Sequence, residues 1–174
     1  MVSEDLRQRL ARIRLVLLDV DGILTDGRLL WLGDEVGWGR FFHVSDGYGI
    51  KLLLRNQLPV GLISGSDNNS TRERIKLLGI PMAFLGSEDK REAWTQALAQ
   101  TGVREEETLY MGDELFDIPL LKRAGFAATV SSATSAVQAV VHYVCERPAG
   151  HGAVREVLDL LCAVQNLRTD APDF

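Results

Sequence analysis

The stretch Arg14-Leu15-Val16-Leu17-Leu18-Asp19-Val20-Asp21-Gly22 decides the fold predicted for this chain. Its apolar part runs without interruption into Asp19, which is the pattern of a strand buried on both faces of a parallel sheet. Further apolar runs of similar length predict more strands of this kind; they cover residues 58–63, 81–85, 108–111 and 125–130.

Helical patterns separate these runs. They cover residues 70–78, 90–100, 117–124, 133–142 and 154–164, and glycines such as Gly79 and Gly125 follow where a helix would end. Alternation of strands and helices predicts an α/β fold, with a doubly wound, Rossmann-like parallel sheet. We expect one domain over residues 1–174, with a frayed tail at about 168–174 and no insertion long enough for a helical cap.

One segment interrupts the alternation. Residues 28–42 are rich in β-formers and hold two of the three tryptophans, so they predict a β-hairpin that turns near Gly33-Asp34. A hairpin of this composition would expose much apolar surface unless something covered it. It is therefore expected to form an oligomer interface or a lid.

Composition excludes some classes of protein. With a net charge of −5, the chain lacks the surplus of basic residues that a nucleic-acid binder usually has. No apolar run approaches the roughly 20 residues that are needed to span a bilayer. Cys145 and Cys162 are not in a metal-binding or redox spacing, which favours reduced, packed thiols and a cytoplasmic setting.

Polar residues follow the predicted strands where ligands bind in open parallel sheets. They are Asp19 and Asp21 after the first, Ser64 after the second, and Asp113 after the fourth, while Lys90 opens a helix. Carboxylates that crowd one edge repel one another, and oxygen-only ligands favour Mg²⁺. Ser64 and Lys90 would then stabilise phosphoryl oxygens.

Asp19 and Asp21 suit two steps of phosphoryl transfer. One carboxylate can attack phosphorus, and the other can protonate the leaving oxygen and later take a proton from water.

Each residue also has a simpler interpretation. Asp21-Gly22 could be an ordinary turn, Ser64 and the aspartates at 113 and 117 could cap helices, and Lys90 could be solvated. A calcium loop is excluded because Ile23 and Leu30 occupy its fifth and twelfth positions. Only the joint order of these residues favours catalysis.

Together these residues resemble the haloacid dehalogenase superfamily of phosphohydrolases. The match is D-x-D-G-x-x-T-D at residues 19–26, then Ser64, then Lys90, then G-D-x-x-x-D at residues 112–117. A narrower resemblance, over about residues 15–161, is to the 3-deoxy-D-manno-octulosonate 8-phosphate (KDO 8-phosphate) phosphatase family. It is carried by residues 19–27, the predicted hairpin, residues 46–50 and the late segment at residues 150–156.

The resemblance implies a role for each matching residue. Asp19 would be the nucleophile and a Mg²⁺ ligand, Asp21 the general acid/base and a ligand through its backbone carbonyl, and Asp113 a third ligand. Ser64 and Lys90 would hold the transferring phosphoryl group. Asp117 and Glu114 would support these groups from behind. The residues implied to bind substrate are Thr25, Asp26, Asp46, Gly47, Gly65, His151 and Arg155.

Two of these residues keep a second interpretation. His151 could be a loop residue without a role, and Arg155 could pair with Glu156 or with solvent. The sequence also departs from the family pattern, because Ser45 and Ser66 stand where the family usually has arginine and His151 lies in its glycine-rich loop.

The expected activity is Mg²⁺-dependent hydrolysis of a phosphorylated sugar acid, KDO 8-phosphate first, through an aspartyl-phosphate. The alternatives are a phosphatase for a nine-carbon sugar-acid 9-phosphate (sialic acid or KDN type), a mutase, and a non-catalytic oligomeric binding module. The resemblance also implies a homotetramer in which a neighbouring subunit helps to close the active site, and a place in lipopolysaccharide biosynthesis.

Overall fold

A sheet of six parallel strands forms the centre of the molecule in the computed structural model, which describes residues 3–169. The strand order is β5-β4-β1-β6-β7-β8. Their bounds are Leu15–Leu18 (β1), Val60–Ser64 (β4), Met82–Leu85 (β5), Thr108–Met111 (β6), Phe126–Val130 (β7) and Tyr143–Cys145 (β8). The predicted α/β fold with a parallel sheet is confirmed.

Strand β1 lies in the middle of this sheet and is buried along its whole length. Leu18 is in register with Leu62 of β4 on one side and with Met111 of β6 on the other. The three strands therefore end at one edge, where Asp19, Ser64 and Gly112-Asp113 come together. This placement is what the uninterrupted apolar run before Asp19 predicts.

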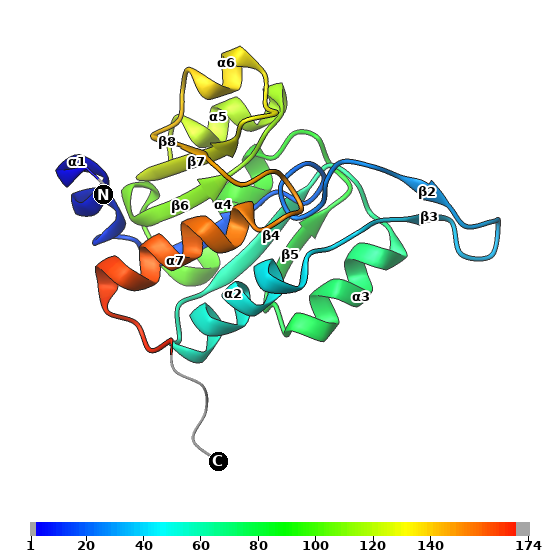
Figure 1. The fold of residues 1–174 in the computed structure, drawn as a ribbon, viewed down its shortest axis with the longest axis horizontal. Helices are drawn as coiled ribbons and strands as arrows, with labels where there is room; N and C mark the ends of the chain where they lie inside the picture. Colours follow the sequence, from blue (N-terminus) through cyan, green and yellow to red (C-terminus); the bar gives the residue numbers. More distant parts are fainter. Residues whose placement is uncertain (1–2, 170–174) are drawn as a thin grey trace.

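Helices flank the sheet, and Figure 1 shows α2 and α7 lying across it side by side. Helix α1 packs against α7, whereas α4 packs against α5 and β4. The bounds are Glu4–Leu10 (α1), Val44–Arg55 (α2), Asn69–Leu78 (α3), Arg91–Thr101 (α4), Ile118–Leu121 (α5), Ser135–Gln138 (α6) and Ala153–Gln165 (α7), with 3₁₀ turns at Glu105–Glu107 (η1) and Leu115–Asp117 (η2).

Two predicted helices are shorter than expected. The pattern at 133–142 yields only α6, because the chain must leave the helix before His142, whose backbone N–H donates to Ala127 O at 2.9 Å next to the β7–β8 pairing. The pattern at 117–124 yields η2 followed by α5. The structure also contains α1, α2 and β8, which no sequence pattern predicted.

The predicted hairpin is present, with β2 at Leu30–Trp31 and β3 at Trp38–Gly39. Its loop runs from Gly33 to Gly37, and Figure 1 shows it projecting away from the rest of the molecule. Apolar side chains along it are about half exposed: Leu29, Leu30, Trp31, Leu32, Val36, Trp38 and Phe41. The expectation of a large exposed apolar surface is therefore confirmed.

The predicted frayed tail is only partly described. Arg168 is held by Asn56, because its backbone N–H donates to Asn56 Oδ1 at 3.0 Å and its carbonyl accepts from Asn56 Nδ2 at 2.9 Å. Residues 170–174 of the predicted frayed tail lie outside the described part. Among residues 3–169 no helix is both long and apolar enough to cross a membrane.

Candidate active site

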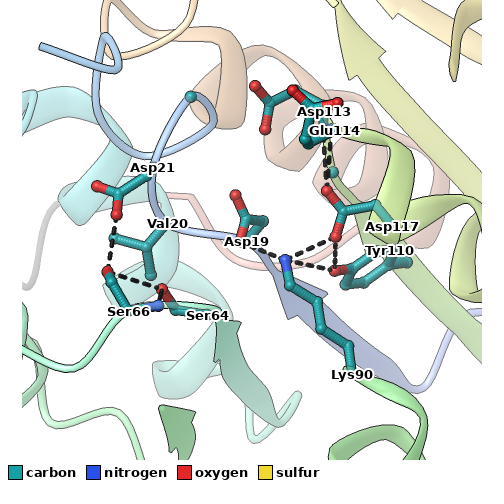
Figure 2. A network of polar contacts seen from close by, with 12 residues as sticks. Asp19, Val20, Asp21, Ser64, Ser66, Lys90, Tyr110, Asp113, Glu114 and Asp117 are labelled. Carbon is teal, nitrogen blue, oxygen red and sulfur yellow. Dashed lines mark hydrogen bonds and ion pairs between the residues drawn. The ribbon is translucent and has the colours of Figure 1, made fainter. Parts of the chain in front are cut away.

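The chain turns sharply after β1, and this turn separates the two aspartates of the first motif. The backbone N–H groups of Leu24 and Thr25 both donate to Val20 O at 3.0 Å, which closes the turn. Figure 2 shows the consequence: Asp19 lies beside Lys90, while Asp21 lies beside Ser66. The two carboxyl groups therefore have separate surroundings and can serve separate steps.

Lys90 is a buried cation between two buried carboxylates. Its Nζ donates to Asp19 Oδ1 at 2.5 Å and to Asp117 Oδ1 at 2.6 Å, and it lies 4.7 Å from the centre of the Phe116 ring. Burial lowers the pKa of Lys90, but the two carboxylates outweigh this effect, so the pKa is raised and the ammonium stays charged. The interpretation of Lys90 as a solvated lysine is therefore wrong.

Asp117 anchors this cluster. Its Oδ1 accepts from Lys90 and from Tyr110 Oη, both at 2.6 Å, and its Oδ2 accepts from the backbone N–H groups of Asp113 and Glu114, both at 3.1 Å. All of these contacts fix the loop after β6 and the Lys90 ammonium in one geometry. Asp117 therefore contacts Lys90 and the loop backbone directly, and its carboxylate is also close enough to Asp19 and Asp113 to count among candidate metal ligands.

Three carboxylates form a candidate cation site. Oxygen atoms of Asp19, Asp113 and Asp117 lie within 4.8 Å of one another. Lys90 is the ammonium bonded to this group, so the ionised set carries −2. Among the described residues, Asp113 Oδ1 is buried without a hydrogen-bond partner. A divalent cation would balance the charge and satisfy this oxygen, so the residues fit Mg²⁺.

The pKa values respond to the same crowding. Burial, and after it the Asp117 carboxylate, raise the pKa of Asp113 to about 6, while Lys90 opposes this shift. Burial also raises the pKa of Asp19, against the attraction of Lys90. Both shifts mean that burial and neighbouring carboxylates disfavour the ionised form here, and the positive charge of a bound cation would favour it.

Two glycines make room for these carboxylates. A Cβ on Gly22, whose φ is +90°, would lie 2.1 Å from Asp113 Oδ2, and one on Gly112 would lie 2.5 Å from Asp117 Cγ. Neither position can therefore hold another residue without moving an acidic side chain. Asp21-Gly22 forms a turn, but its geometry also serves the cluster.

Asp21 is held by a residue that the sequence analysis missed. Arg40, from the chain that leaves the hairpin, donates through Nε to Asp21 Oδ1 at 2.5 Å and through Nη2 to Oδ2 at 3.0 Å. Ser66 Oγ also donates to Oδ2, at 2.8 Å. Burial raises the pKa of Asp21, but these hydrogen bonds together outweigh it and leave the pKa lowered.

Ser64 is buried at the end of β4, and its Oγ accepts the backbone N–H of Ser66 at 3.2 Å. Gly65 lies against Glu88, since a Cβ there would be 3.3 Å from Glu88 Cγ. The position where the family usually has arginine is thus a serine that bonds Asp21, and Arg40 brings a guanidinium within 3.2 Å of it. No spacing rule in the sequence could have linked residues 40, 21 and 66.

The predicted substrate-binding residues divide into buried and accessible ones. Thr25 and Asp46 are buried: Thr25 Oγ1 donates to Val20 O at 3.3 Å, and Asp46 accepts the backbone N–H groups of Gly152 and Arg155 at 3.2 and 2.7 Å. The hydrogen bonds of these two side chains hold backbone segments in place. Gly47 packs against Arg74, since a Cβ there would lie 2.3 Å from Arg74 Nη2.

The remaining predicted residues lie nearer the surface. Asp26 pairs with Arg28 at 2.6 Å, and His151 Nδ1 lies 2.7 Å from Gly150 O, with its ring 6.3 Å from that of His43. Arg155 pairs with Asp159 at 2.6 Å, so the expected alternative partner Glu156 is wrong. Glu156 instead accepts from Tyr143 Oη at 2.7 Å.

Glu114, predicted to support the site from behind, is exposed, and its Oε1 accepts the Leu115 N–H at 2.7 Å. Its side chain caps η2, and only its backbone N–H bonds Asp117.

Comparison with known proteins shows which family this chain resembles. A family model described as haloacid dehalogenase-like hydrolase matches residues 86–158. The 3-deoxy-D-manno-octulosonate 8-phosphate phosphatase KdsC of Yersinia pestis is 36% identical over 165 residues, which cover 95% of this chain and 88% of the relative. The chain belongs to the KDO 8-phosphate phosphatase family of haloacid dehalogenase-like hydrolases.

Solved structures of the family share this fold. The phosphatase from Moraxella catarrhalis, solved with a magnesium ion, a phosphate ion and KDO, has a TM-score of 0.90 at 32% identity, over 95% of this chain and 94% of that one. The cobalt-bound enzyme from Haemophilus influenzae has a TM-score of 0.87 at 38% identity, over 91% and 92%.

Proposed function

We propose that this chain is a magnesium-dependent phosphatase that hydrolyses KDO 8-phosphate through an aspartyl-phosphate on Asp19, with residues 1–174 acting as one domain. The observation that carries the proposal is the cluster at the end of β1. There Lys90 Nζ donates a hydrogen bond to Asp19 Oδ1 at 2.5 Å, and the carboxylates of Asp113 and Asp117 lie beside Asp19. The first motif is intact, which argues against a non-catalytic module.

The chemistry divides between the two aspartates. Asp19 Oδ2, the oxygen not bonded to Lys90, attacks phosphorus; an O–P bond forms to Asp19 and the bond from phosphorus to the sugar oxygen breaks. Asp21, in its protonated form, gives a proton to that leaving oxygen. Asp21 then takes a proton from water as the water attacks the aspartyl-phosphate, which releases phosphate and restores Asp19.

Other residues hold this machinery in place. Lys90, fixed by Asp117 and Tyr110, orients Asp19 and neutralises part of its charge. Ser64 lies at the end of β4, where its hydroxyl would contact phosphoryl oxygens. Asp19 and Asp113, with the Asp21 carbonyl, would hold Mg²⁺, which supplies positive charge for the oxygens of the transferring group.

The sugar is assigned from the relatives. KDO 8-phosphate is the substrate named for the Yersinia pestis enzyme, and KDO itself is bound in the Moraxella catarrhalis structure. A nine-carbon sugar-acid 9-phosphate is the second candidate, because Ser45 and Ser66 occupy positions where the family usually has arginine.

Phosphate release should be measured with Mg²⁺ on KDO 8-phosphate, on a sialic acid 9-phosphate and on a neutral hexose phosphate. We expect the first to be preferred, EDTA to abolish turnover, and added Mg²⁺ to restore it. Asp19→Asn should lose at least about 10³-fold in kcat while it unfolds at the wild-type temperature. Turnover that survives EDTA or the Asp19 substitution would overturn the mechanism; preference for the nine-carbon substrate would overturn only the assignment of the sugar.

Assembly and location belong to the same proposal. We infer a homotetramer in which the half-exposed apolar side chains of the hairpin are covered by other copies, a state that sedimentation velocity measures directly. A monomer at micromolar concentration would contradict it. A cytoplasmic location and a step of lipopolysaccharide biosynthesis follow if the substrate is KDO 8-phosphate, and the free, buried state of Cys145 and Cys162 suits a reducing compartment.

A further inference from the structure

The guanidinium of Arg40 lies inside the site although its backbone belongs to the segment leaving the exposed hairpin. Its side chain is only 5% exposed. By contrast, the neighbouring Phe41 and the tryptophans of β2 and β3 are about half exposed. Arg40 is thus the point at which the hairpin segment reaches the strand ends, and the group that it reaches is Asp21.

Three hydrogen bonds fix the Asp21 carboxylate on both of its oxygens. Arg40 forms a two-pronged contact, called the fork below, in which Nε donates to Oδ1 and Nη2 donates to Oδ2. The same Nη2 donates to Ser66 Oγ at 3.2 Å. Ser66 then donates to Asp21 Oδ2 at 2.8 Å, which closes a ring of contacts. A planar guanidinium on both oxygens fixes the plane of a carboxylate, which a single donor cannot do.

Stability alone does not account for this pair. Among the described residues, Arg40 Nη1 is buried without a hydrogen-bond partner. Burying a charged group with an unsatisfied donor costs free energy, and buried ion pairs are often no more stabilising than apolar residues in their place. The same fork occurs on the surface between Arg91 and Asp89, where both side chains are more than half exposed and no such cost arises.

We propose that Arg40 is a positioning residue for Asp21: it holds the carboxylate in the one plane from which it can take a proton from the water that attacks the aspartyl-phosphate. The inference rests on the proposed role of Asp21 as acid/base. Proton transfer needs the carboxyl within hydrogen-bond reach and correctly aligned, so the fork acts on the chemical step and not on substrate binding.

The kinetic test compares Arg40→Ala, Arg40→Lys and a matched control, Arg91→Ala, which removes the same kind of fork from the surface. Arg40→Ala should lower kcat by roughly 10- to 100-fold and change KM by less than about 3-fold. Arg40→Lys should retain part of the rate, because an ammonium restores the charge but not the planar fork. Added guanidinium ion should raise the rate of Arg40→Ala only, and Arg91→Ala should match wild type.

A crystal structure of Arg40→Ala with Mg²⁺ supplies a readout that does not depend on the substrate. We expect the Asp21 carboxyl to have rotated while Asp19, Lys90 and Asp113 stay in place. An unmoved Asp21, a change in KM alone, or equal losses in the Arg40 and Arg91 variants would overturn the proposal. Failure of the wild type on sugar-acid phosphates would instead refute the proposed function, while the crystal structure would still decide the role of Arg40.

Discussion

Replacing Lys90 with methionine tests the electrostatic core of the site. Methionine is about as long as lysine and unbranched, so the change removes the charge and leaves most of the packing. Asp19 and Asp117 would then lose the cation that lies 2.5 and 2.6 Å from their oxygens, inside a region where Lys90 has no exposed surface. Breaking a buried ion pair on one side costs about 3–5 kcal/mol.

In a chain of this size each kcal/mol lowers Tm by roughly 2–4 °C, so Lys90→Met should unfold about 10 °C below wild type at pH 7.5 in EDTA. The sign of the pH dependence follows from the Asp19 carboxyl, whose pKa burial already raises in the folded state. A carboxyl with a raised pKa is stabilising while protonated, and the folded protein loses that stability as pH rises. The deficit of Lys90→Met should therefore be smaller at pH 5 than at pH 7.5.

Thermal unfolding followed by circular dichroism measures both effects, with and without Mg²⁺. Mg²⁺ should stabilise the variant, because it supplies the missing positive charge. The matched control is Lys76→Met, since Lys76 pairs with Glu73 on α3 with both side chains about 70% exposed, and such pairs contribute less than about 1 kcal/mol. A Lys90→Met variant that unfolds within about 2 °C of wild type in EDTA would refute the reasoning.

Three further perturbations have defined outcomes. Gly22→Ala should weaken Mg²⁺ binding at least about 10-fold by calorimetry, because its Cβ would overlap Asp113 Oδ2 at a φ of +90°; unchanged affinity would contradict the packing. Mg²⁺ affinity should fall as pH drops through about 6, where protons compete for Asp113, and a flat profile from pH 5 to 8 would be the contrary result. Asp46→Ala should cost about 2–3 kcal/mol in urea unfolding, because it strips two backbone N–H groups at the start of α7 of their acceptor, and a loss below about 0.5 kcal/mol would contradict this.

The sequence predicts the strand-end placement of Asp19 well because burial and polarity are both local signals there. An apolar run that ends in Asp19 indicates both that the strand is buried and that a carboxylate follows it. Helix α2 was missed for the opposite reason: Gly47 and Gly49 are poor helix formers, and the helix exists because they allow close approach of Arg74, Leu78 and Arg155. That reason lies in tertiary contacts, which a single sequence does not display.

Arg40 was missed for a related reason. In the sequence it is one more charged residue at the end of a predicted hairpin, and its partner Asp21 lies 19 positions earlier. Strand β8 was missed because three residues of mixed exposure carry almost no periodic signal. Long-range pairing of charges and short edge strands are therefore the features that sequence patterns reveal least.

The tryptophans give this molecule a built-in spectroscopic reporter. Trp31 and Trp38 lie across from each other on the hairpin with ring centres 5.0 Å apart, each about half exposed, whereas Trp94 is fully buried beside Tyr110. Emission that acrylamide quenches must therefore come from the hairpin pair. As the protein is diluted, the wavelength of this emission and its quenching by acrylamide would report how completely other molecules shield those two rings. No added label is needed.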